Sequence, residues 1–321
     1  MKTSFLKIIV GLALLTVFGG ASAQAAEKEI NLGIISTESS QNLRQIWEPL
    51  LDDMSAKTGL TFKPFFATDY AGVIEAMRFG KVDIAWVGNK AAMEAVDRAN
   101  AEIFVQTVSA DGSEGYYSHL ITHVDAPLNS LEDVLKNSKN LTFGNGDPNS
   151  TSGFLVPSYY VFALNNVDPK TAFKRAVNAS HETNALSVAN KQVDVATNNS
   201  ENLDRLVKTA PDKKKLIKVI WTSPLIPSDP LIWRKDLDGA VKSVVKDFML
   251  NYGRGGEAKE IKILADLGWK GFKNSDDNQL KPIRQLELFK EKTKLENDST
   301  MEAGQKQAKL QDVERRLKEL E

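Results

Sequence analysis

Short apolar runs alternate with longer amphipathic segments in the first third of the chain. Residues 30–36, 60–66 and 82–86 are apolar enough to indicate buried strands. After each of them apolar residues recur at helical spacing, and the second and third of these helices begin near Tyr70 and Asn89. Strand–helix alternation of this kind predicts an α/β domain with a mainly parallel sheet.

The middle of the chain repeats this pattern. Strands are expected at 141–143 and 193–197, and helices at 154–164, 182–190 and 200–208. The order helix, Val-Asp, strand, helix occurs in both halves. This repetition predicts two lobes of one architecture, and the small number of identities leaves chance repetition as the alternative.

Two short connections are expected between the lobes, one near Ser118–Thr122 and one near Trp221–Pro227. Two such crossings form a hinge. The chain then returns to the first lobe with strand 230–234 and helix 236–252. The predicted division of the chain is a signal peptide at 1–23, a first lobe at 24–118 and 227–281, a second lobe at 119–226, and a C-terminal helical tail at 282–321.

The tail is rich in charge and almost free of glycine and proline. Its apolar positions Leu310, Val313, Leu317 and Leu320 alternate in spacing between three and four residues, which is a heptad seam. Such a seam is typical of contact with a second copy of the chain. The alternative is a single amphipathic helix that folds onto its own lobe.

The N-terminus has the pattern of an export signal. Lys2 and Lys7 precede an apolar run, 8–18, and Ala21-Ser22-Ala23 follows it as a cleavage site for signal peptidase; cleavage after Ala25 is an alternative. A membrane anchor is the competing interpretation, but the run is short for ~30 Å of hydrocarbon. The mature protein is therefore expected to be soluble outside the cytoplasm, in the periplasm.

Composition excludes several kinds of chemistry. The chain has no cysteine, which rules out disulfides, thiolate catalysis and cysteine-ligated metals. Only three histidines are present, which argues against a histidine-rich metal site, and we expect no metal and no cofactor. A formal net charge of −1 implies no broad basic face for nucleic acid.

A hydroxyl cluster follows the strand at 141–143. A turn rich in glycine ends the strand, and Ser150, Thr151 and Ser152 then precede a helical pattern. Hydroxyls beside the free N–H groups of a helix start can bind an anion. The alternative is an ordinary N-cap, for which one hydroxyl suffices.

Other polar residues stand at helix starts or next to the expected crossings. Tyr70, Tyr116 and His181 can each donate a hydrogen bond to an anion, although such residues are more often packed in a core. Glu201 and Asp229 have local roles available, at a helical first turn and before a proline. If both acids instead face the cleft, they predict a cationic subsite and a zwitterionic ligand.

An enzyme is the alternative class of function. Ser152, His181 and Asp229 are the residue types of a hydrolase triad, but the sequence has no Gly-x-Ser-x-Gly motif. A structural or adhesive protein that uses its C-terminal helix is a third class. It predicts that no small molecule binds.

Several of these motifs resemble those of the phosphonate-binding periplasmic proteins of ABC transporters. The most specific is Phe143-Gly144-Asn145-Gly146-Asp147-Pro148-Asn149-Ser150-Thr151-Ser152-Gly153-Phe154. The others are Thr68-Asp69-Tyr70-Ala71-Gly72, Val82-Asp83-Ile84-Ala85-Trp86, His181-Glu182-Thr183-Asn184-Ala185 and Val193-Asp194-Val195-Ala196-Thr197-Asn198-Asn199. The resemblance covers nearly all of the mature chain. It departs at Val87, where close relatives carry tyrosine, and it is poor after Lys290.

The resemblance implies a two-lobed, type II solute-binding fold that closes on a phosphonate and delivers it to a membrane permease. It implies 2-aminoethylphosphonate as the ligand, with related phosphorus oxyanions (phosphite, alkylphosphonate, phosphate) as the alternative. The residues that match those holding the phosphonate are Ser150, Thr151, Ser152, Tyr70, Tyr116 and His181. Those that match the residues holding the amino group are Glu201 and Asp229. The implied partners are the permease subunits, and the seam of the C-terminal helix adds a homodimer.

Overall fold

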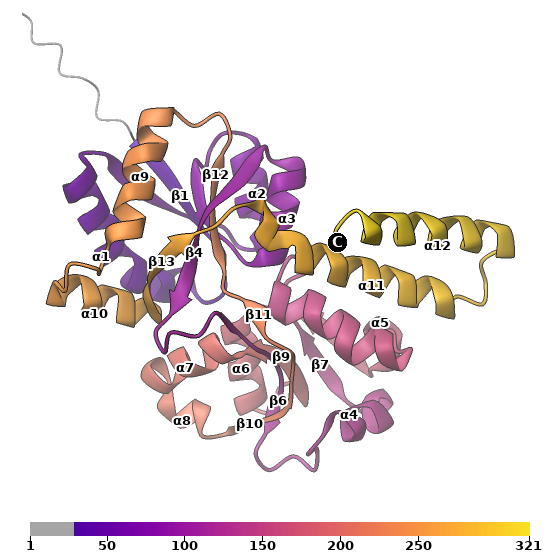
Figure 1. Ribbon diagram of the computed structural model, residues 1–321. Helices are drawn as coiled ribbons and strands as arrows, with labels where there is room; N and C mark the ends of the chain where they lie inside the picture. The colour runs from indigo at the N-terminus through magenta and orange to yellow at the C-terminus, as the bar shows by residue number, and fades with distance from the viewer. Residues whose placement is uncertain (1–28) are drawn as a thin grey trace, which may run out of the picture.

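The computed structural model describes residues 29–321, in two lobes with a helical hairpin beside them (Figure 1). The expected signal peptide, 1–23, lies outside the described residues. None of the helices within residues 29–321 is both long and apolar enough to cross a membrane.

The first lobe is built on a six-stranded sheet with the order β13-β4-β12-β3-β1-β2. Strands β2, β1 and β3 are parallel, as expected from strand–helix alternation, whereas β12 and β13 add antiparallel pairings. The antiparallel strands arise because the chain returns from the other lobe before it completes this sheet. The strands are β1 (Glu29–Ile34), β2 (Thr61–Phe66), β3 (Ile84–Trp86), β4 (Ala101–Ser109), β12 (Pro230–Arg234) and β13 (Trp269–Asn274).

The helices of this lobe bury their apolar faces against the sheet. Three indole rings, Trp47, Trp86 and Trp269, meet in the core with centroids 5.4 to 5.9 Å apart. The helices begin where the sequence supplies caps: the side chains of Ser39 and Asp69 accept backbone N–H bonds at the starts of α1 and α2. The helices are α1 (Ser40–Thr58), α2 (Tyr70–Arg78), α3 (Asn89–Arg98), α9 (Gly239–Asn251) and α10 (Ala258–Leu267).

The second lobe has a five-stranded sheet with the order β10-β6-β9-β7-β8. Its apolar core includes Leu120, Phe143, Phe162 and Val195. The strands are β6 (Ser118–His123), β7 (Thr142–Asn145), β8 (Arg175–Asn178), β9 (Val195–Asn199) and β10 (Ile217–Thr222). The helices are α4 (Leu131–Asn137), η1 (Ser138–Asn140), α5 (Pro169–Ala172), α6 (His181–Ala189), α7 (Ser200–Thr209) and α8 (Pro211–Lys214).

The helical segment after β7 begins earlier than the apolar pattern predicted. It starts at Thr151 rather than at Phe154, and it is wound loosely: the Leu155 N–H donates to Ser150 O, five residues back, at 3.1 Å. Two π-helical turns, η2 (Thr151–Leu155) and η3 (Ser158–Phe162), are followed by a 3₁₀ turn, η4 (Ala163–Asn165). Wide turns of this type are frequent at functional sites.

The two connections between the lobes pair with each other as β5 (Gly115–Tyr116) and β11 (Ile226–Pro227). The first expected crossing, Ser118–Thr122, was wrong: these residues belong to β6, because they pair with both β9 and β10. The true crossing therefore comes a few residues earlier. Gly115 is required there, since a Cβ atom would lie 2.0 Å from Ile226 O.

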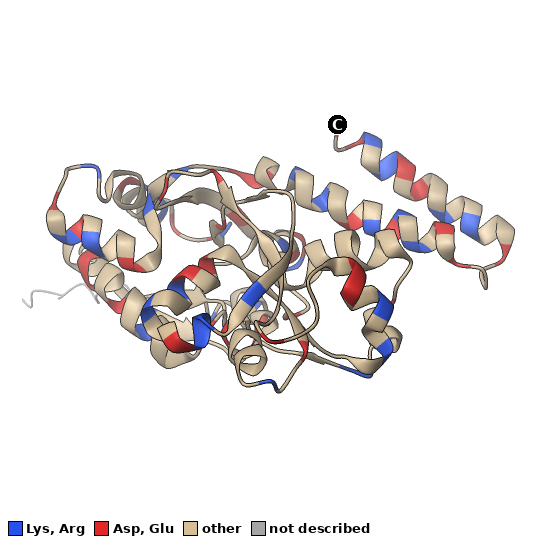
Figure 2. Ribbon diagram, turned by 90° about the horizontal axis from the view of Figure 1, so that it is seen from below, with Lys and Arg blue, Asp and Glu red and all other residues tan. Residues whose placement is uncertain are grey.

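The tail forms a hairpin of α11 (Lys281–Asn297) and α12 (Ala303–Lys318), preceded by η5 (Asp277–Leu280). The seam residues of α12 pack against Leu288 and Leu295 of α11, so the seam is covered within one chain. Helix α11 contacts the first lobe through an Arg284–Asp97 ion pair and the second lobe through the Phe289 and Tyr159 rings. Residues of both charges are interspersed along the hairpin (Figure 2). The homodimer through this helix stays a prediction.

Candidate functional site

A polar cavity lies between the two lobes. All eight residues singled out in the sequence line it, and its empty volume is about 260 Å³. The lobes are thus closed over a small space. The lining residues are Ile35, Thr37, Tyr70, Trp86, Gly88, Tyr116, Ser150, Thr151, Ser152, His181, Asn199, Glu201, Arg205 and Asp229.

The three hydroxyls at the start of η2 have different partners. Ser150 is the N-cap of the helical segment, because its Oγ accepts the Gly153 N–H at 2.9 Å. Thr151 Oγ1 accepts the Lys90 N–H of α3 at 2.8 Å, which joins this segment to the opposite lobe. Ser152 Oγ accepts from Asn199 Nδ2 at 3.0 Å. Capping therefore accounts for one hydroxyl of the three, and each of them keeps an O–H that can donate to an anion.

His181 stands at the start of α6, with its Nε2 3.4 Å from both the Ser150 and the Ser152 hydroxyl oxygens. Burial, together with the positive charge of Arg205, lowers the pKa of His181 to about 3. The ring is therefore neutral near pH 7 and has one N–H to donate. Its Nδ1 has no hydrogen-bond partner among residues 29–321.

Tyr70 and Tyr116 come from the first lobe and the crossing, and both are buried. Burial is the main reason that the pKa of each phenol is raised well above its usual value, and nearby carboxylates add to it. Both hydroxyls are therefore protonated donors. Tyr116 was predicted to meet the phosphonate, but in this structure its O–H donates to Asp229 Oδ1 at 2.9 Å. Tyr116 therefore lies between the hydrogen-bond donors of the cavity and its carboxylates.

Asp229 and Glu201 form a pair of acids on the wall of the cavity. Burial raises the pKa of Asp229 well above its usual value, and the charge of Glu201 raises it further. Burial also raises the pKa of Glu201, with Arg205 acting in the opposite direction. Within residues 29–321 neither acid has a cation within ion-pair distance. Asp229 is held in place by its carbonyl, which accepts from the N–H and the hydroxyl of Thr107 at 3.0 Å each.

The hydrolase triad does not form. Ser152 and His181 are in contact, but the carboxylate of Asp229 bonds to Tyr116 and to Asn89 Nδ2 (3.4 Å), not to the imidazole. A triad needs a carboxylate on the second ring nitrogen to hold the tautomer, and that nitrogen of His181 has no partner in the described part of the chain.

The departure from the family at Val87 lies outside the cavity. Val87 is fully buried, and the residues on either side of it, Trp86 and Gly88, form the wall. A Cβ at Gly88 would lie 3.2 Å from Thr151 Oγ1, so a side chain there would crowd the hydroxyl cluster.

Several polar residues that the sequence did not single out hold the two lobes together. Glu182 of α6 accepts from the Ser39 N–H at 2.7 Å and from Asn42 Nδ2 at 2.6 Å. Arg205 of α7 pairs with Glu38, which follows β1. Spacing could have drawn attention to Arg205, since it lies one helical turn after Glu201 on the same face of α7. Glu182 stands within the motif that begins at His181, but its contact with α1 is not indicated by the local sequence, and nothing there marks Glu38.

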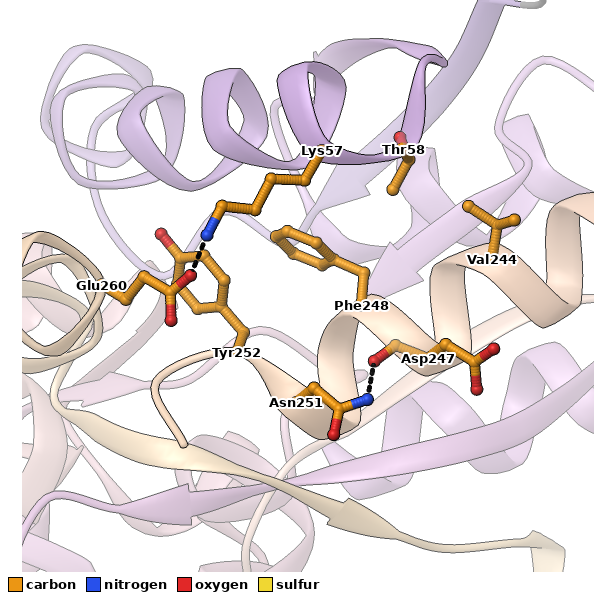
Figure 3. A pocket seen from close by; sticks show the side chains of 8 residues that line it. All are labelled: Lys57, Thr58, Val244, Asp247, Phe248, Asn251, Tyr252 and Glu260. Carbon is orange, nitrogen blue, oxygen red and sulfur yellow. Dashed lines mark hydrogen bonds and ion pairs between the residues drawn. The ribbon is translucent and has the colours of Figure 1, made fainter. Parts of the chain in front are cut away.

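A larger pocket lies at the C-terminal end of α1, a helix about 28 Å long. Figure 3 shows Lys57, Phe248 and Tyr252 lining it, with Glu260 facing Lys57. Glu260 is satisfied by Lys57 and by the Gly253 N–H at 2.7 Å. This pocket is open and lacks a set of convergent donors, so its greater size does not make it the site.

Two α/β lobes joined by a double crossing, with a buried cavity of donors and acids between them, are the architecture of a two-lobed solute-binding protein. Known proteins carry the identification further. Residues 32–280 match the family described as "ABC transporter, phosphonate, periplasmic substrate-binding protein". The chain belongs to this family, and it is a substrate-binding component of a transporter rather than an enzyme.

Individual relatives agree with the family. The chain is 56% identical to the phosphonates-binding periplasmic protein of Escherichia coli K12, over 98% of this chain and 94% of that one. The structure of a binding protein component of an ABC phosphonate transporter from Pseudomonas aeruginosa has a TM-score of 0.90 at 61% identity and covers 92% of this chain and 97% of its own. PhnD1 from Prochlorococcus marinus, solved with methylphosphonate, shares the fold with a TM-score of 0.72 at 22% identity, covering 81% of this chain and 97% of its own.

Proposed function

We propose that this protein captures 2-aminoethylphosphonate in the cleft between its lobes and delivers it to the permease of an ABC importer. The family supports phosphonate as the class of ligand. The choice of an aminoalkylphosphonate rests on this chain's own side chains.

The anionic head is assigned to the donor half of the cavity. Ser150, Thr151 and Ser152 offer hydroxyls, and the first turn of η2 offers backbone N–H groups. Neutral His181 and the protonated phenols of Tyr70 and Tyr116 add donors from other elements. A phosphonate has three acceptor oxygens, so it matches a site built from many donors and few cations.

The ammonium is assigned to Glu201 and Asp229. The observation that carries the proposal is that two buried acids share this small cavity with the donors, while no cation within residues 29–321 pairs with either acid. The charge of Arg205 acts on both acids, but its guanidinium is already paired with Glu38. The two buried acids therefore remain costly, and a ligand ammonium would reduce that cost. Phosphate, phosphite and alkylphosphonates have no group to place there.

Transport requires that the protein be exported and that it open and close. The proposed export signal at residues 1–23 would bring it to the periplasm. The contacts of Glu182 with α1 and of Thr151 with α3 cross the cleft, and they support closure of the lobes over a bound ligand.

Calorimetric titration with 2-aminoethylphosphonate, ethylphosphonate and phosphate tests the proposal. We expect saturable binding of 2-aminoethylphosphonate that is at least about tenfold tighter than binding of ethylphosphonate, and ligand that is recovered unchanged. Equal or tighter binding of phosphate or ethylphosphonate would refute the assignment of the ammonium subsite.

A further inference from the structure

Arg205 and Glu38 form an ion pair across the cleft, Nε donating to Oε1. Glu38 comes from the loop between β1 and α1 in the first lobe, and Arg205 comes from α7 in the second. Both side chains are buried, with 12% and 3% of the side chain exposed for Arg205 and Glu38 respectively. The pair therefore forms only where the two lobes come together.

Arg205 separates two spaces. On one side it lines the ligand cavity, where Glu201 lies one helical turn before it on α7. On the other side it lines an outer pocket, together with Glu38, Asn42, Lys208 and Asp266, and the empty volume of this pocket is about 660 Å³. The guanidinium of Arg205 therefore lies between the ligand cavity and the outer pocket. It is close to Glu201, one of the two acids to which the ammonium of the ligand is assigned.

We propose that Arg205, held in place by its ion pair with Glu38, is the end wall of the ligand cavity and limits the length of the carbon chain that a phosphonate ligand can carry. This inference rests on the proposed function, because it places the head of the ligand among the hydroxyls and its tail toward Glu201. A two-carbon chain stops at the wall. A longer chain would have to displace a buried ion pair, and the space beyond it is already present as the outer pocket.

The main variant removes both members of the pair. Truncating Arg205 alone would leave the carboxylate of Glu38 buried without its partner, which destabilises the closed form whatever the ligand. The double variant Glu38→Ala/Arg205→Ala removes both charges and joins the ligand cavity to the outer pocket. Glu38→Ala alone is a second variant, because it frees Arg205 to turn toward Asp266 in the outer pocket.

The experiment measures affinity by calorimetry for ethyl-, propyl- and butylphosphonate and for 2-aminoethyl- and 3-aminopropylphosphonate. The unaltered protein should bind each longer chain about tenfold or more weakly than the two-carbon one. In the double variant this loss of affinity with chain length, the length penalty, should shrink by about tenfold. Glu38→Ala should also reduce the length penalty. Thermal unfolding verifies that each variant is folded.

Lys208→Ala is the matched control. Lys208 lies on α7 beside the outer pocket and donates to Ala265 O across the lobes at 3.1 Å, but it does not line the ligand cavity. Its loss should leave the length penalty unchanged. An unchanged penalty in both wall variants, or an equal change in Lys208→Ala, would overturn the inference.

The two ligand series separate this inference from the proposed function. Alkylphosphonates lack an ammonium, so their length penalty reports on the wall even if 2-aminoethylphosphonate binds poorly. Poor binding of 2-aminoethylphosphonate beside a clear length penalty would refute only the proposed function. A flat length series beside tight binding of 2-aminoethylphosphonate would refute only the wall, and absence of binding by every phosphonate would refute both.

Discussion

Converting Asp229 to asparagine should distinguish the contribution of the ligand's ammonium to affinity from the contribution of its phosphonate. Asp229 is 6% exposed and accepts the Tyr116 hydroxyl at 2.9 Å. An asparagine has the same shape, and its Oδ1 can still accept from Tyr116, so the substitution removes a charge and leaves the wall in place. Glu201→Gln makes the same change at the second acid.

The magnitude follows from the desolvation of the ammonium. In Asp229→Asn the ammonium enters the same buried cavity with one carboxylate fewer, and loss of one partner of a buried charged pair costs ~2–4 kcal/mol. At 1.4 kcal/mol per factor of ten, this is a loss of about 30- to 700-fold in affinity for 2-aminoethylphosphonate. Ethylphosphonate has no ammonium, so its affinity should hold or rise as a buried negative charge disappears.

The assay is parallel calorimetry of both ligands on both variants. Thr151→Ala and His181→Ala are the controls, because these side chains are assigned to the anionic head and their loss should weaken both ligands. Equal losses of the two ligands in Asp229→Asn and Glu201→Gln would mean that the acids have only local structural roles, and the zwitterionic ligand would be refuted.

Three other outcomes are expected. The ratio of affinities for 2-aminoethylphosphonate and ethylphosphonate should rise as pH rises above the ordinary range of a carboxyl group, because burial raises the pKa of Asp229 and ammonium binding then releases a proton; a flat ratio would contradict this. The same raised pKa means that the contribution of Asp229 to stability is full below its unfolded pKa and is lost as pH rises through the folded one. Asp229→Asn should therefore raise the melting temperature of the ligand-free protein at neutral pH, and a lower one would count against this reasoning. Ending the chain after Asn297 removes α12 and should leave ligand affinity unchanged, since every residue of the cavity precedes it. Sedimentation of both lengths tests the dimer: a monomeric full-length chain would refute contact through α12.

The sequence by itself determined the elements and much of the site. Apolar periodicity located the strands and helices, because burial of one face is a local property of the pattern. Caps such as Ser39 and Asp69 act within one turn of their own helix, so they too were visible in the sequence. The hydroxyl cluster and the motifs around Tyr70 and His181 were specific enough to indicate the family, which the comparisons confirmed.

The tertiary structure decided which distant groups meet. The Arg205–Glu38 pair joins residues of different lobes, and the bond from Tyr116 to Asp229 joins the two crossings; neither is encoded in local spacing. The bounds of some strands also depend on distant residues. Ser118–Thr122 looks like a connection in the sequence, but in the fold it is a strand because β9 and β10 pair with it on either side. The seam of α12 had two alternatives in the sequence because a heptad pattern specifies an apolar partner without specifying which one. In the fold that partner is α11 of the same chain, since a short turn returns α12 against it.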